Sequence, residues 1–431
     1  MSCSLLLDFG ATRIKSALVN DATGQIEHVQ SRACTAAVCH NAQFEIPLAG
    51  LTRDFLEICK SYETHDFKRI LMCSQMHGFV LCDKNNQPLT EYISWQDERA
   101  LLPLGSGPSS WKLFFDAFGS TFKEKTGMRL RSCFPVVKVL DYLRQHHAEY
   151  IKVLSLPEAL LLAGKPSHRV HVTMAAGSGM IDFASAQPDK EMCDFLRQEG
   201  NGTEIVFNTI SKQVIPAGTV AINHRDIPVY TAIGDHQCAV WGAGNTLETL
   251  SFNIGTGSQV SAICTQAPNT LQTERRHFLN GLELQTITHI PAGRVLAALM
   301  NFYHTLTGKD GWERFTAVPL KHVQQAAGRF NLSFFKDAWN YTDGGGITGL
   351  ALADLNESTL WAELFRSFAQ QYVRAANHFS PRRKQLILSG GKLAKLPALA
   401  SFFEQELSMT VHLSAQTDET LVGLAKLAKE I

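Results

Sequence analysis

The chain has 431 residues, of which 45% are hydrophobic and 19% are charged, so it can form sizeable buried cores and is not a disordered protein. Lysine and arginine number 40, as do aspartate and glutamate, and this balance argues against a protein built mainly to hold nucleic acid or an acidic membrane surface. No apolar run reaches the roughly 18 residues of a membrane span, and the ten cysteines, with no Cys-x-x-Cys spacing, predict reduced thiols in a cytoplasmic protein.

The first predicted elements are strands joined by tight turns. No basic segment precedes the apolar run Leu5–Leu7, so we expect a buried strand here and not a signal peptide. The elements predicted in this part are strands at 5–9, 14–19 and 26–31, a helix opened by Pro47 with apolar residues at 48, 51, 55, 58, 59 and 62, and a strand at 69–74. Strands and helices mix, so the predicted class is α/β.

A second strand–turn–strand pattern begins near Leu250. Placing Leu250–Ala262 under Leu5–Ala17 matches four of thirteen residues, and Asp8 then lies opposite Asn253. We infer a duplicated domain, with residues 1–245 and 246–431 as its two copies; two unrelated hairpins are the alternative. The second half is further predicted to contain a strand at 285–290, a helix after Gly293, a glycine loop at 344–346, a long helix capped by Ser358, a strand at 386–388 and a helix at 421–428.

Two of the predicted turns could bind phosphate groups. Asp8–Lys15 places an acid at a strand end before small residues, whose backbone N–H groups can point at phosphate oxygens, and Asp8 can hold a hydrated Mg²⁺. Asn253–Ser258 repeats the arrangement with two glycines, a threonine and a serine. An ordinary hairpin is the alternative for each turn, and the pair is more specific than either member.

Three further segments carry candidate chemistry. Asp235 follows the apolar stretch Val229–Gly234 and precedes a small-residue helix, which fits either a helix N-cap or a general base. His77 lies in a loop beside Gly78, and Trp95–Arg99 combines an aromatic, an amide, two acids and a guanidinium, a mixture that suits a polyol. The alternatives without a function are that His77 is an incidental histidine and that Trp95–Arg99 is a solvated turn.

Taken in order, these segments resemble the FGGY family of carbohydrate kinases over essentially the whole chain. The landmarks are Asp8–Lys15, Gln75–Gly78, Trp95–Arg99, Gly234–Gln237, Gly255–Ser258, Gly390-Gly391 and Glu419–Ala425. The resemblance implies two ribonuclease-H-like domains of the actin and Hsp70 type facing across a cleft. The first domain would bind the sugar and carry the first phosphate loop, and the second would bind the nucleotide.

The resemblance also implies ATP, Mg²⁺ and a small-molecule sugar as ligands, no nucleic acid or membrane partner, and a monomer or homodimer. Asp235 is then the catalytic base, and Asp8 and Asp235 are the metal-side acids. The remaining implied site residues bind nucleotide and phosphates (Thr12, Lys15, Gly255, Thr256, Gly257, Gly293, Gly390, Gly391 and Lys395) or the sugar (Met76, His77, Gln96, Asp97 and Asp235).

The Trp95–Asp97 run and the segment 253–260 are most similar to sedoheptulokinases, which implies transfer of the ATP γ-phosphoryl group to sedoheptulose; a xylulokinase or another sugar or polyol kinase of the family is the alternative. Two departures bear on the nucleotide: Gly10–Arg13 lacks one hydroxyl of the usual loop, and Lys395 stands where the family often has asparagine. Two functions of other classes are alternatives. One is an actin-like nucleotide switch or sugar sensor without catalysis, and the other is a plain ATPase.

Overall fold

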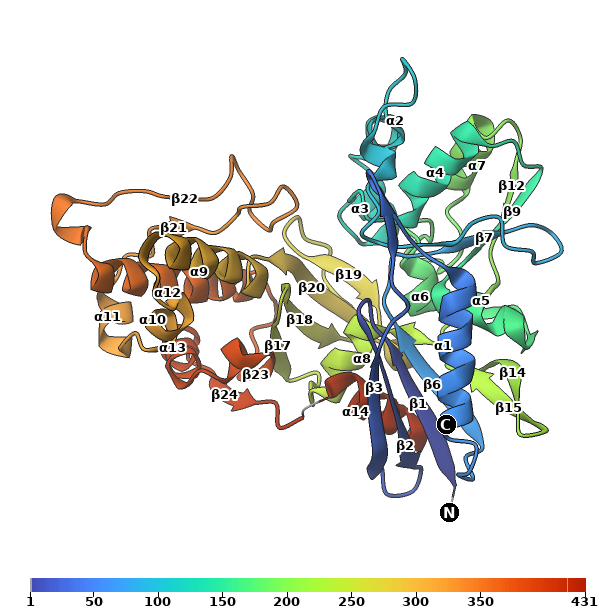
Figure 1. The fold of residues 1–431 in the computed structure, drawn as a ribbon. Helices are drawn as coiled ribbons and strands as arrows, with labels where there is room; N and C mark the ends of the chain where they lie inside the picture. Colours follow the sequence, from blue (N-terminus) through green and yellow to red (C-terminus); the bar gives the residue numbers. More distant parts are fainter. Residues whose placement is uncertain (1, 417) are drawn as a thin grey trace. The chain divides into compact units, whose positions relative to one another are not determined.

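The computed structural model describes residues 2–416 and 418–431, and the chain forms two compact units (Figure 1). The first unit runs to Gly242 and also contains residues 276–283 and the segment from Gln416; the second contains residues 243–275 and 284–415. The predicted α/β class is confirmed. The ten cysteines, all of which lie in the described residues, form no disulfide with one another. Within the described residues, no helix is both long enough and apolar enough to cross a membrane.

The first unit is built on a mixed sheet of order β10-β14-β15-β6-β1-β2-β3, with β16 also paired to β6. Its strands are β1 (Cys3–Phe9), β2 (Arg13–Asn20), β3 (Ile26–Ala33), β6 (Arg69–Ser74), β10 (Lys165–Pro166), β14 (Pro216–Ile222), β15 (Arg225–Tyr230) and β16 (Ile233–Gly234). The strands expected at 5–9, 14–19, 26–31 and 69–74 are therefore present. β1 runs antiparallel to β2 and parallel to β6, and β16 is also parallel to β6.

Helices cover both faces of this sheet. Alternate side chains of β1, Leu5, Leu7 and Phe9, join one buried cluster with residues of α1 (Leu48–Ser61), including Phe55. Because side chains alternate along a strand, Asp8 lies on the opposite face. That face carries α8 (Asp235–Gly242) and α14 (Glu419–Glu430), which pack against β6 and, for α14, also against β1 and β2 (Figure 1).

The rest of the first unit partly joins the buried cluster of the sheet and partly forms a second cluster around phenylalanine side chains. Phe114, Phe122 and Phe134 are fully buried there. Its helices are α2 (Ser110–Phe118), α3 (Phe122–Thr126), α4 (Pro135–Gln145), α5 (Leu156–Leu160), α6 (Val172–Ala176) and α7 (Lys190–Glu199), with 3₁₀ turns η1 (Arg99–Leu101), η2 (Leu161–Ala163) and η3 (Leu279–Gly281). The small sheets are β4 (Val38–His40), β5 (Gln43–Ile46) and β8 (Tyr92–Ile93); β7 (Val80–Cys82), β9 (Tyr150–Leu154) and β12 (Glu204–Val206); and β11 (Arg169–His171) with β13 (Thr209–Ser211).

The second unit has a sheet of order β19-β20-β18-β17-β23-β24. Its strands are β17 (Thr249–Ile254), β18 (Ser258–Cys264), β19 (Glu274–His277), β20 (Glu283–Ile290), β23 (Gln385–Gly390) and β24 (Thr410–Leu413), with a small pair β21 (Phe330–Asn331) and β22 (Gly346–Ile347). Its helices are α9 (Gly293–Thr307), α10 (Gly311–Thr316), α11 (Leu320–Gln325), α12 (Glu357–Ala376) and α13 (Pro397–Leu407), with η4 (Leu352–Asp354) and η5 (Lys392–Lys395).

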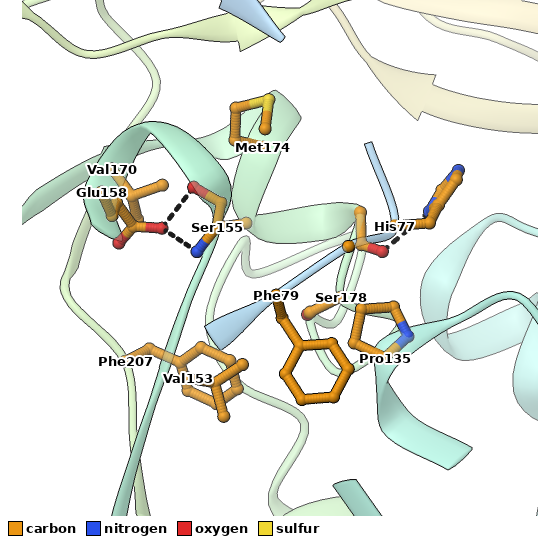
Figure 2. A pocket seen from close by; sticks show the side chains of 13 residues that line it. His77, Phe79, Pro135, Val153, Ser155, Glu158, Val170, Met174, Ser178 and Phe207 are labelled. Atoms are coloured by element: carbon orange, nitrogen blue, oxygen red, sulfur yellow. Dashed lines mark hydrogen bonds between the residues drawn. The ribbon is translucent and has the colours of Figure 1, made fainter. Parts of the chain in front are cut away.

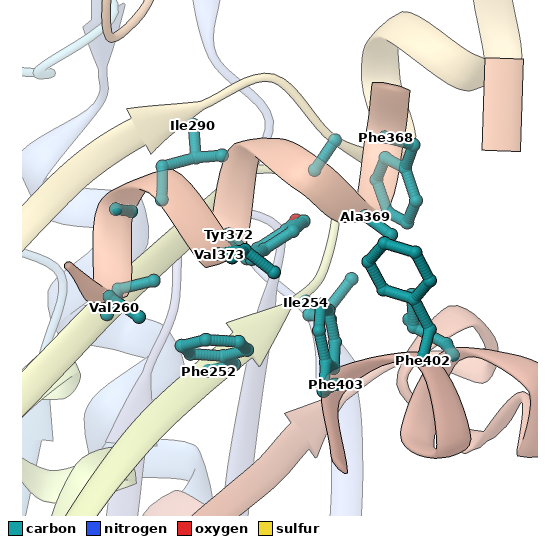
Figure 3. Close-up of a cluster of buried hydrophobic side chains, with 14 of the residues drawn as sticks. Phe252, Ile254, Val260, Ile290, Phe368, Ala369, Tyr372, Val373, Phe402 and Phe403 are labelled. Atoms are coloured by element: carbon teal, nitrogen blue, oxygen red, sulfur yellow. The ribbon is translucent and has the colours of Figure 1, made fainter. Parts of the chain in front are cut away.

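The core of the second unit forms where α12 and α13 meet β17 (Figure 3). The Phe252 ring lies 5.5 Å from that of Tyr372 and 5.0 Å from that of Phe403. The apolar stripe predicted for the long helix is confirmed, but its predicted cap is wrong. Asn356 caps α12 by accepting a hydrogen bond from Thr359 N, and Ser358 lies inside the first turn.

The two units repeat one local topology, as the duplication predicts. β17 is antiparallel to β18 and parallel to β23, just as β1 is to β2 and β6. Asp8 faces Lys15 across the first hairpin, and Asn253, at the matching position, faces Gln259 across the second. The predicted alignment of Asp8 with Asn253 is therefore the structural one.

The C-terminal helix α14 belongs to the first unit, although it was predicted as part of residues 246–431. The reason is a close crossing of α14 with α8. A Cβ atom on Gly242 would lie 1.6 Å from the backbone oxygen of Glu419, and one on Gly423 would lie 2.3 Å from that of Cys238. Glycine at both positions allows the backbones to touch, and this packing ties the end of the chain to the first sheet.

Candidate active site

Two carboxylates meet at one edge of the first sheet. Asp8 is opposite Cys73 in the pairing of β1 with β6, and Gly234 is opposite Ser74 in the pairing of β16 with β6. Asp235 follows Gly234 directly. Because all three strands are parallel, their carboxyl ends lie together, and the sequence-predicted acids Asp8 and Asp235 are brought to the same edge.

Asp8 is a buried carboxylate held by neutral donors. Thr420 Oγ1 donates to its Oδ2 over 2.6 Å, and Cys73 Sγ donates to its Oδ1 over 3.5 Å. Burial raises the pKa of Asp8 above its ordinary value, and the Thr420 hydrogen bond and the Lys15 charge partly offset this rise. These donors fix the orientation of the carboxylate, and among the described residues no cation bonds to it directly.

Asp235 also has a raised pKa. Its Oδ1 accepts a hydrogen bond from His236 N over 2.8 Å. Burial, and after it the negative charge of Asp8, raises the pKa of Asp235 to about 7. A carboxylate with a pKa near neutrality can accept a proton from an alcohol during a reaction and release it to water afterwards. The role of Asp235 as a base stays a prediction.

Two residues of the α14 region take part in this site and were not predicted as site residues. Lys15 forms an ion pair with Asp418, and Thr420 holds Asp8. Burial lowers the pKa of Lys15, but the contacts with Asp418 and the charge of Asp8 outweigh burial and raise it. The only sequence signal was the landmark Glu419–Ala425, because nothing local connects residues some 400 positions apart.

The first predicted phosphate loop is a tight turn. Gly10 N donates to Arg13 O over 3.2 Å, and the side chain of Thr12 is exposed. The Arg13 guanidinium bonds to the Oγ and the carbonyl oxygen of Ser31 on β3. Arg13 therefore links the turn to β3. This contact explains why the loop has an arginine where the family usually has another residue.

The predicted sugar motif lies beside Gly234, which precedes Asp235. A Cβ atom on Gly234 would lie 2.6 Å from Met76 Sδ, so Met76 packs against the residue that precedes Asp235. His77 has a left-handed backbone with φ of 65°, and its Nδ1 lies 2.8 Å from Gly177 O. Its ring meets that of Phe134 edge-on at 4.7 Å. These contacts fix the His77 ring in a half-buried position.

Gln75 opens the landmark Gln75–Gly78 but was not predicted as a site residue. Its side chain is 3% exposed, and neither polar atom of its amide has a partner among residues 2–416 and 418–431. Buried amides are almost always hydrogen-bonded in proteins. Gln75 N donates to Phe9 O, next to Asp8, so the unsatisfied amide belongs to the same strand edge. A hydroxyl-rich ligand or a water would satisfy it.

A small cavity lies behind His77 (Figure 2). Its volume of about 20 Å³ is enough for about one water molecule and far too small for a sugar. Glu158 lines it and accepts hydrogen bonds from Ser155 N and Oγ and from Asn208 Nδ2. Burial raises the pKa of Glu158 to about 7. With these partners, Glu158 serves as a helix-capping group and not as a second base.

The Trp95–Arg99 segment is a turn whose base is rigid and whose tip is exposed. The buried Asp97 carboxylate accepts N–H groups from Phe44 and from the backbone and side chain of Arg99. Its lone-pair positions are thus already used, so Asp97 holds the turn, and its contacts give no support to a direct sugar bond. The exposed Gln96 at the tip is the better candidate for ligand contact.

In the second unit, three predicted nucleotide segments are brought together. Gly293 N and Arg294 N donate to Gly255 O and Thr256 O, so the loop docks on the start of α9. Gly391 N donates to Ile254 O over 3.0 Å, and this places the Gly390-Gly391 turn beside the same loop.

The loops that carry these nucleotide segments are exposed to solvent. The side chain of Thr256 is exposed, a Cβ atom on Gly257 would meet nothing within 4 Å, and Lys395 on η5 is exposed. Gly390 has φ of 108°, and a Cβ atom there would lie 2.6 Å from Ile254 O, so this turn requires glycine. The backbone is thus accessible, as the nucleotide prediction requires.

The paired carboxylates Asp8 and Asp235 suit a cation. The influence of the Asp8 charge on the pKa of Asp235 shows mutual repulsion that a divalent ion would relieve. Within the described residues, no group of three or more Cys, His, Asp or Glu side chains could ligate a metal by itself. Two carboxylates fit Mg²⁺, which prefers oxygen ligands and usually keeps several waters.

Comparison with solved structures gives whole-chain matches. A xylulose kinase from Rhodospirillum rubrum has a TM-score of 0.82 at 18% identity and covers 99% of this chain and 89% of that protein. A gluconate kinase from Lactobacillus acidophilus has a TM-score of 0.80 at 17% identity, covering 100% and 89%. At this identity the likeness concerns the fold, which is that of two actin-like domains.

Sequence comparison adds the family. A curated xylulose kinase from Haemophilus influenzae is 26% identical over 216 residues, which cover 47% of this chain and 42% of that protein, less than half of each. The profile of the N-terminal domain of the FGGY family of carbohydrate kinases matches residues 3–242, which is more than half of the chain. With the two carboxylates at the strand edge and the glycine loops of the second unit, this match shows that the chain belongs to the FGGY family of carbohydrate kinases.

Proposed function

We propose that this protein is an ATP-dependent kinase that phosphorylates a ketose. One observation carries the proposal: Asp235 lies at a strand edge beside Asp8, and its pKa is raised to about 7. A general base for an alcohol works best when its pKa is close to the operating pH. The membership of the family supports the same chemistry.

The reaction is an in-line phosphoryl transfer. A sugar hydroxyl oxygen attacks the γ-phosphorus of ATP, the bond from that phosphorus to the β,γ-bridging oxygen breaks, and the hydroxyl proton passes to Asp235. ADP leaves with the bridging oxygen. Such reactions depend on positioning and electrostatics, so Asp235 must be held in place, as its contact with His236 N provides.

The remaining residues bind and orient. Met76 and His77, together with Gln75 and the tip residue Gln96, would bind the sugar in the first unit. The loops at Gly255–Gly257 and Gly390-Gly391, with Gly293 and Lys395, would bind the nucleotide in the second. Thr12 and Lys15 would face phosphates, Lys15 in exchange for part of its contact with Asp418.

Asp8 and Asp235 would hold Mg²⁺, largely through water. When bound, the ion would offset negative charge on the phosphates. The hydrogen bond from Thr420 to Asp8 would keep one of these acids oriented.

Two ketoses are the leading substrates. Sedoheptulose follows from the Trp95–Asp97 run, and xylulose from the names of the similar proteins. Gln96 separates the two interpretations, because the resemblance to xylulokinases implies asparagine at this position and the chain has glutamine. Transfer to either sugar uses the same base and the same phosphate loops.

The test is a coupled assay of ADP release with xylulose, sedoheptulose, ribulose, fructose, gluconate and glycerol, with ATP and Mg²⁺ present. We expect ADP release to depend on one ketose, with the phosphorylated sugar identified by mass spectrometry. ATP hydrolysis that no sugar changes would indicate a plain ATPase. Nucleotide binding without turnover for any of the sugars would indicate a switch or sensor, and either result would overturn the proposal.

A further inference from the structure

One fully buried lysine lies outside the groups described so far. Lys138 is on α4, and its side chain is 0% exposed. Its Nζ donates to Ser94 O over 2.7 Å and to Cys133 O over 3.0 Å. Taking a charged ammonium group out of water is costly unless it is well bonded, so this position calls for an explanation.

The first acceptor is part of the Trp95–Gln96 turn. Ser94 O also accepts Asp97 N over 3.2 Å, which closes the turn around Trp95 and Gln96. Lys138 therefore fixes one end of the turn, while the contacts of Asp97 with Arg99 and Phe44 N fix the other.

The second acceptor leads to His77. Cys133 is followed by Phe134, whose fully buried ring meets the His77 ring edge-on at 4.7 Å. Val136 N, two residues before Lys138, donates to Ser178 O, next to the residue that holds His77 Nδ1. A single ammonium group thus connects the turn that presents Gln96 with the segment that packs against His77.

We propose that Lys138 is a positioning residue for the sugar site, which holds the Ser94–Asp97 turn and the Cys133–Phe134 segment in one fixed relation and so sets the affinity for the sugar without contacting it. This inference rests on the proposed function, because Gln96 and His77 are sugar contacts only if the protein binds a sugar. The structural part of the inference, that Lys138 orders the turn, can be measured without any catalytic turnover.

The charge state of Lys138 adds a pH-dependent consequence. Burial lowers the pKa of Lys138 to about 8; the neighbouring Cys133, Asp97 and Glu98 act to raise it and Arg99 to lower it. Above that pH the ammonium becomes an amine, whose hydrogen bonds to carbonyl oxygens are weaker than those of a cation. The hydrogen bond from Lys138 to Ser94 O, which orders the turn, is then weaker in alkaline solution.

The experiment compares the wild type with Lys138→Met, which keeps the length of the side chain and removes its donors. Lys152→Met is the matched control, because Lys152 Nζ bonds to Asn86 Oδ1, which is not part of the turn. With the ketose that the wild type turns over, we expect Lys138→Met to raise the sugar KM about tenfold, the loss expected for one charged hydrogen bond. The ATP KM and the Lys152→Met constants should stay unchanged.

Two further readouts separate positioning from general destabilisation. The wild-type sugar KM should rise as the pH passes about 8, while that of Lys138→Met should not change there. Hydrogen exchange of the 94–99 amides should be faster in Lys138→Met than in the wild type, whether or not any sugar is a substrate. If Lys138→Met does not fold, Lys138→Gln replaces it.

Unchanged exchange at 94–99 in a folded variant would overturn the inference, as would equal rises in the sugar and ATP KM values. Faster exchange without turnover of any sugar by the wild type would support the structural half and count against the proposed function instead.

Discussion

At the scale of single residues, the site depends on acids whose environments differ. Asp8 is bonded to Thr420 and Cys73, whereas Asp235 receives one backbone donor and has a pKa raised to about 7. The sequence could place both acids at strand ends. It could not predict that the pKa of both acids is raised, because the causes are burial and interactions between groups more than 200 residues apart.

Replacing Asp235 by asparagine should lower kcat by roughly 10²–10⁴, the range for loss of a general base. The amide keeps the shape of the side chain but cannot take the proton. Steady-state kinetics measure the change, and nucleotide binding followed by calorimetry should be retained. The control is Asp226→Asn, which changes an exposed acid paired with Lys165. A variant that keeps more than about a tenth of the wild-type kcat would remove Asp235 from the role of base.

The activity should also depend on pH through Asp235. The base must be ionised before it can accept a proton, and its pKa in the free protein is about 7. We expect kcat/KM for the sugar to fall about tenfold per pH unit as the pH drops below that value. Rates between pH 5.5 and 8 measure this, with thermal unfolding recorded at each pH to show that the protein stays folded. A flat profile would mean that another group sets the rate.

At the scale of elements, the local patterns were predictable and the distant contacts were not. The strand at 69–74 and both hairpins follow from alternation and glycine turns, and the structure has them within one or two residues. The cap of α12 is Asn356 instead of Ser358, because either polar residue suits a cap and the sequence does not choose between them. The position of α14 depends on its crossing with α8, which only the folded chain shows.

The crossing of α8 and α14 should be sensitive to one added methyl group. Gly423→Ala places a Cβ atom 2.3 Å from Cys238 O, so the helices must move apart. We expect a loss of about 1–3 kcal/mol in unfolding free energy, typical of overpacking. Urea unfolding measures it, with Gly346→Ala as the control because a Cβ atom there meets nothing within 4 Å. Equal stability of the two variants would show that the crossing is looser than its distances imply.

The helix α14 should also affect the metal. Thr420→Val removes the hydrogen bond to Asp8 and keeps the size of the side chain. Partners that orient a metal ligand typically change affinity at least about tenfold, so the Mg²⁺ concentration for half-maximal rate should rise by about that factor. Thr316→Val, at an exposed helix position, serves as the control. An unchanged Mg²⁺ requirement would show that Asp8 does not need Thr420 for this task.

At the scale of the whole molecule, two units carry different parts of the proposed site. The sequence alignment placed Asp8 opposite Asn253, and the pairing of the two hairpins agrees with it. Beyond the turn the alignment slips by one residue, because the second hairpin has a shorter turn and Ser261 occupies the position of Ala17, not that of Ser16. The sequence did not predict that residues 276–283 and the final helix belong to the first unit, because it does not indicate which sheet a segment packs against.

Hydrogen exchange can test this division. A non-hydrolysable ATP analogue should slow exchange at 255–257 and 390–391 in the second unit, and the ketose should slow exchange at 75–78 and 94–97 in the first. The open backbone of Gly257 and the buried amide of Gln75 are the reasons for these assignments. Protection by the nucleotide analogue that is confined to the first unit would reverse the assignment.

The discontinuous first unit has a consequence for biosynthesis. Residues up to Gly242 leave the ribosome with the face of the first sheet that α14 covers still bare, and the helix that buries it is made only after the second unit. At about 5–20 residues per second, the wait is about 10–40 s. During translation Asp8 therefore has no Thr420, and Lys15 has no Asp418. A nascent chain stopped at Gly242 should recruit chaperones, and a separate peptide carrying residues 416–431 should release them.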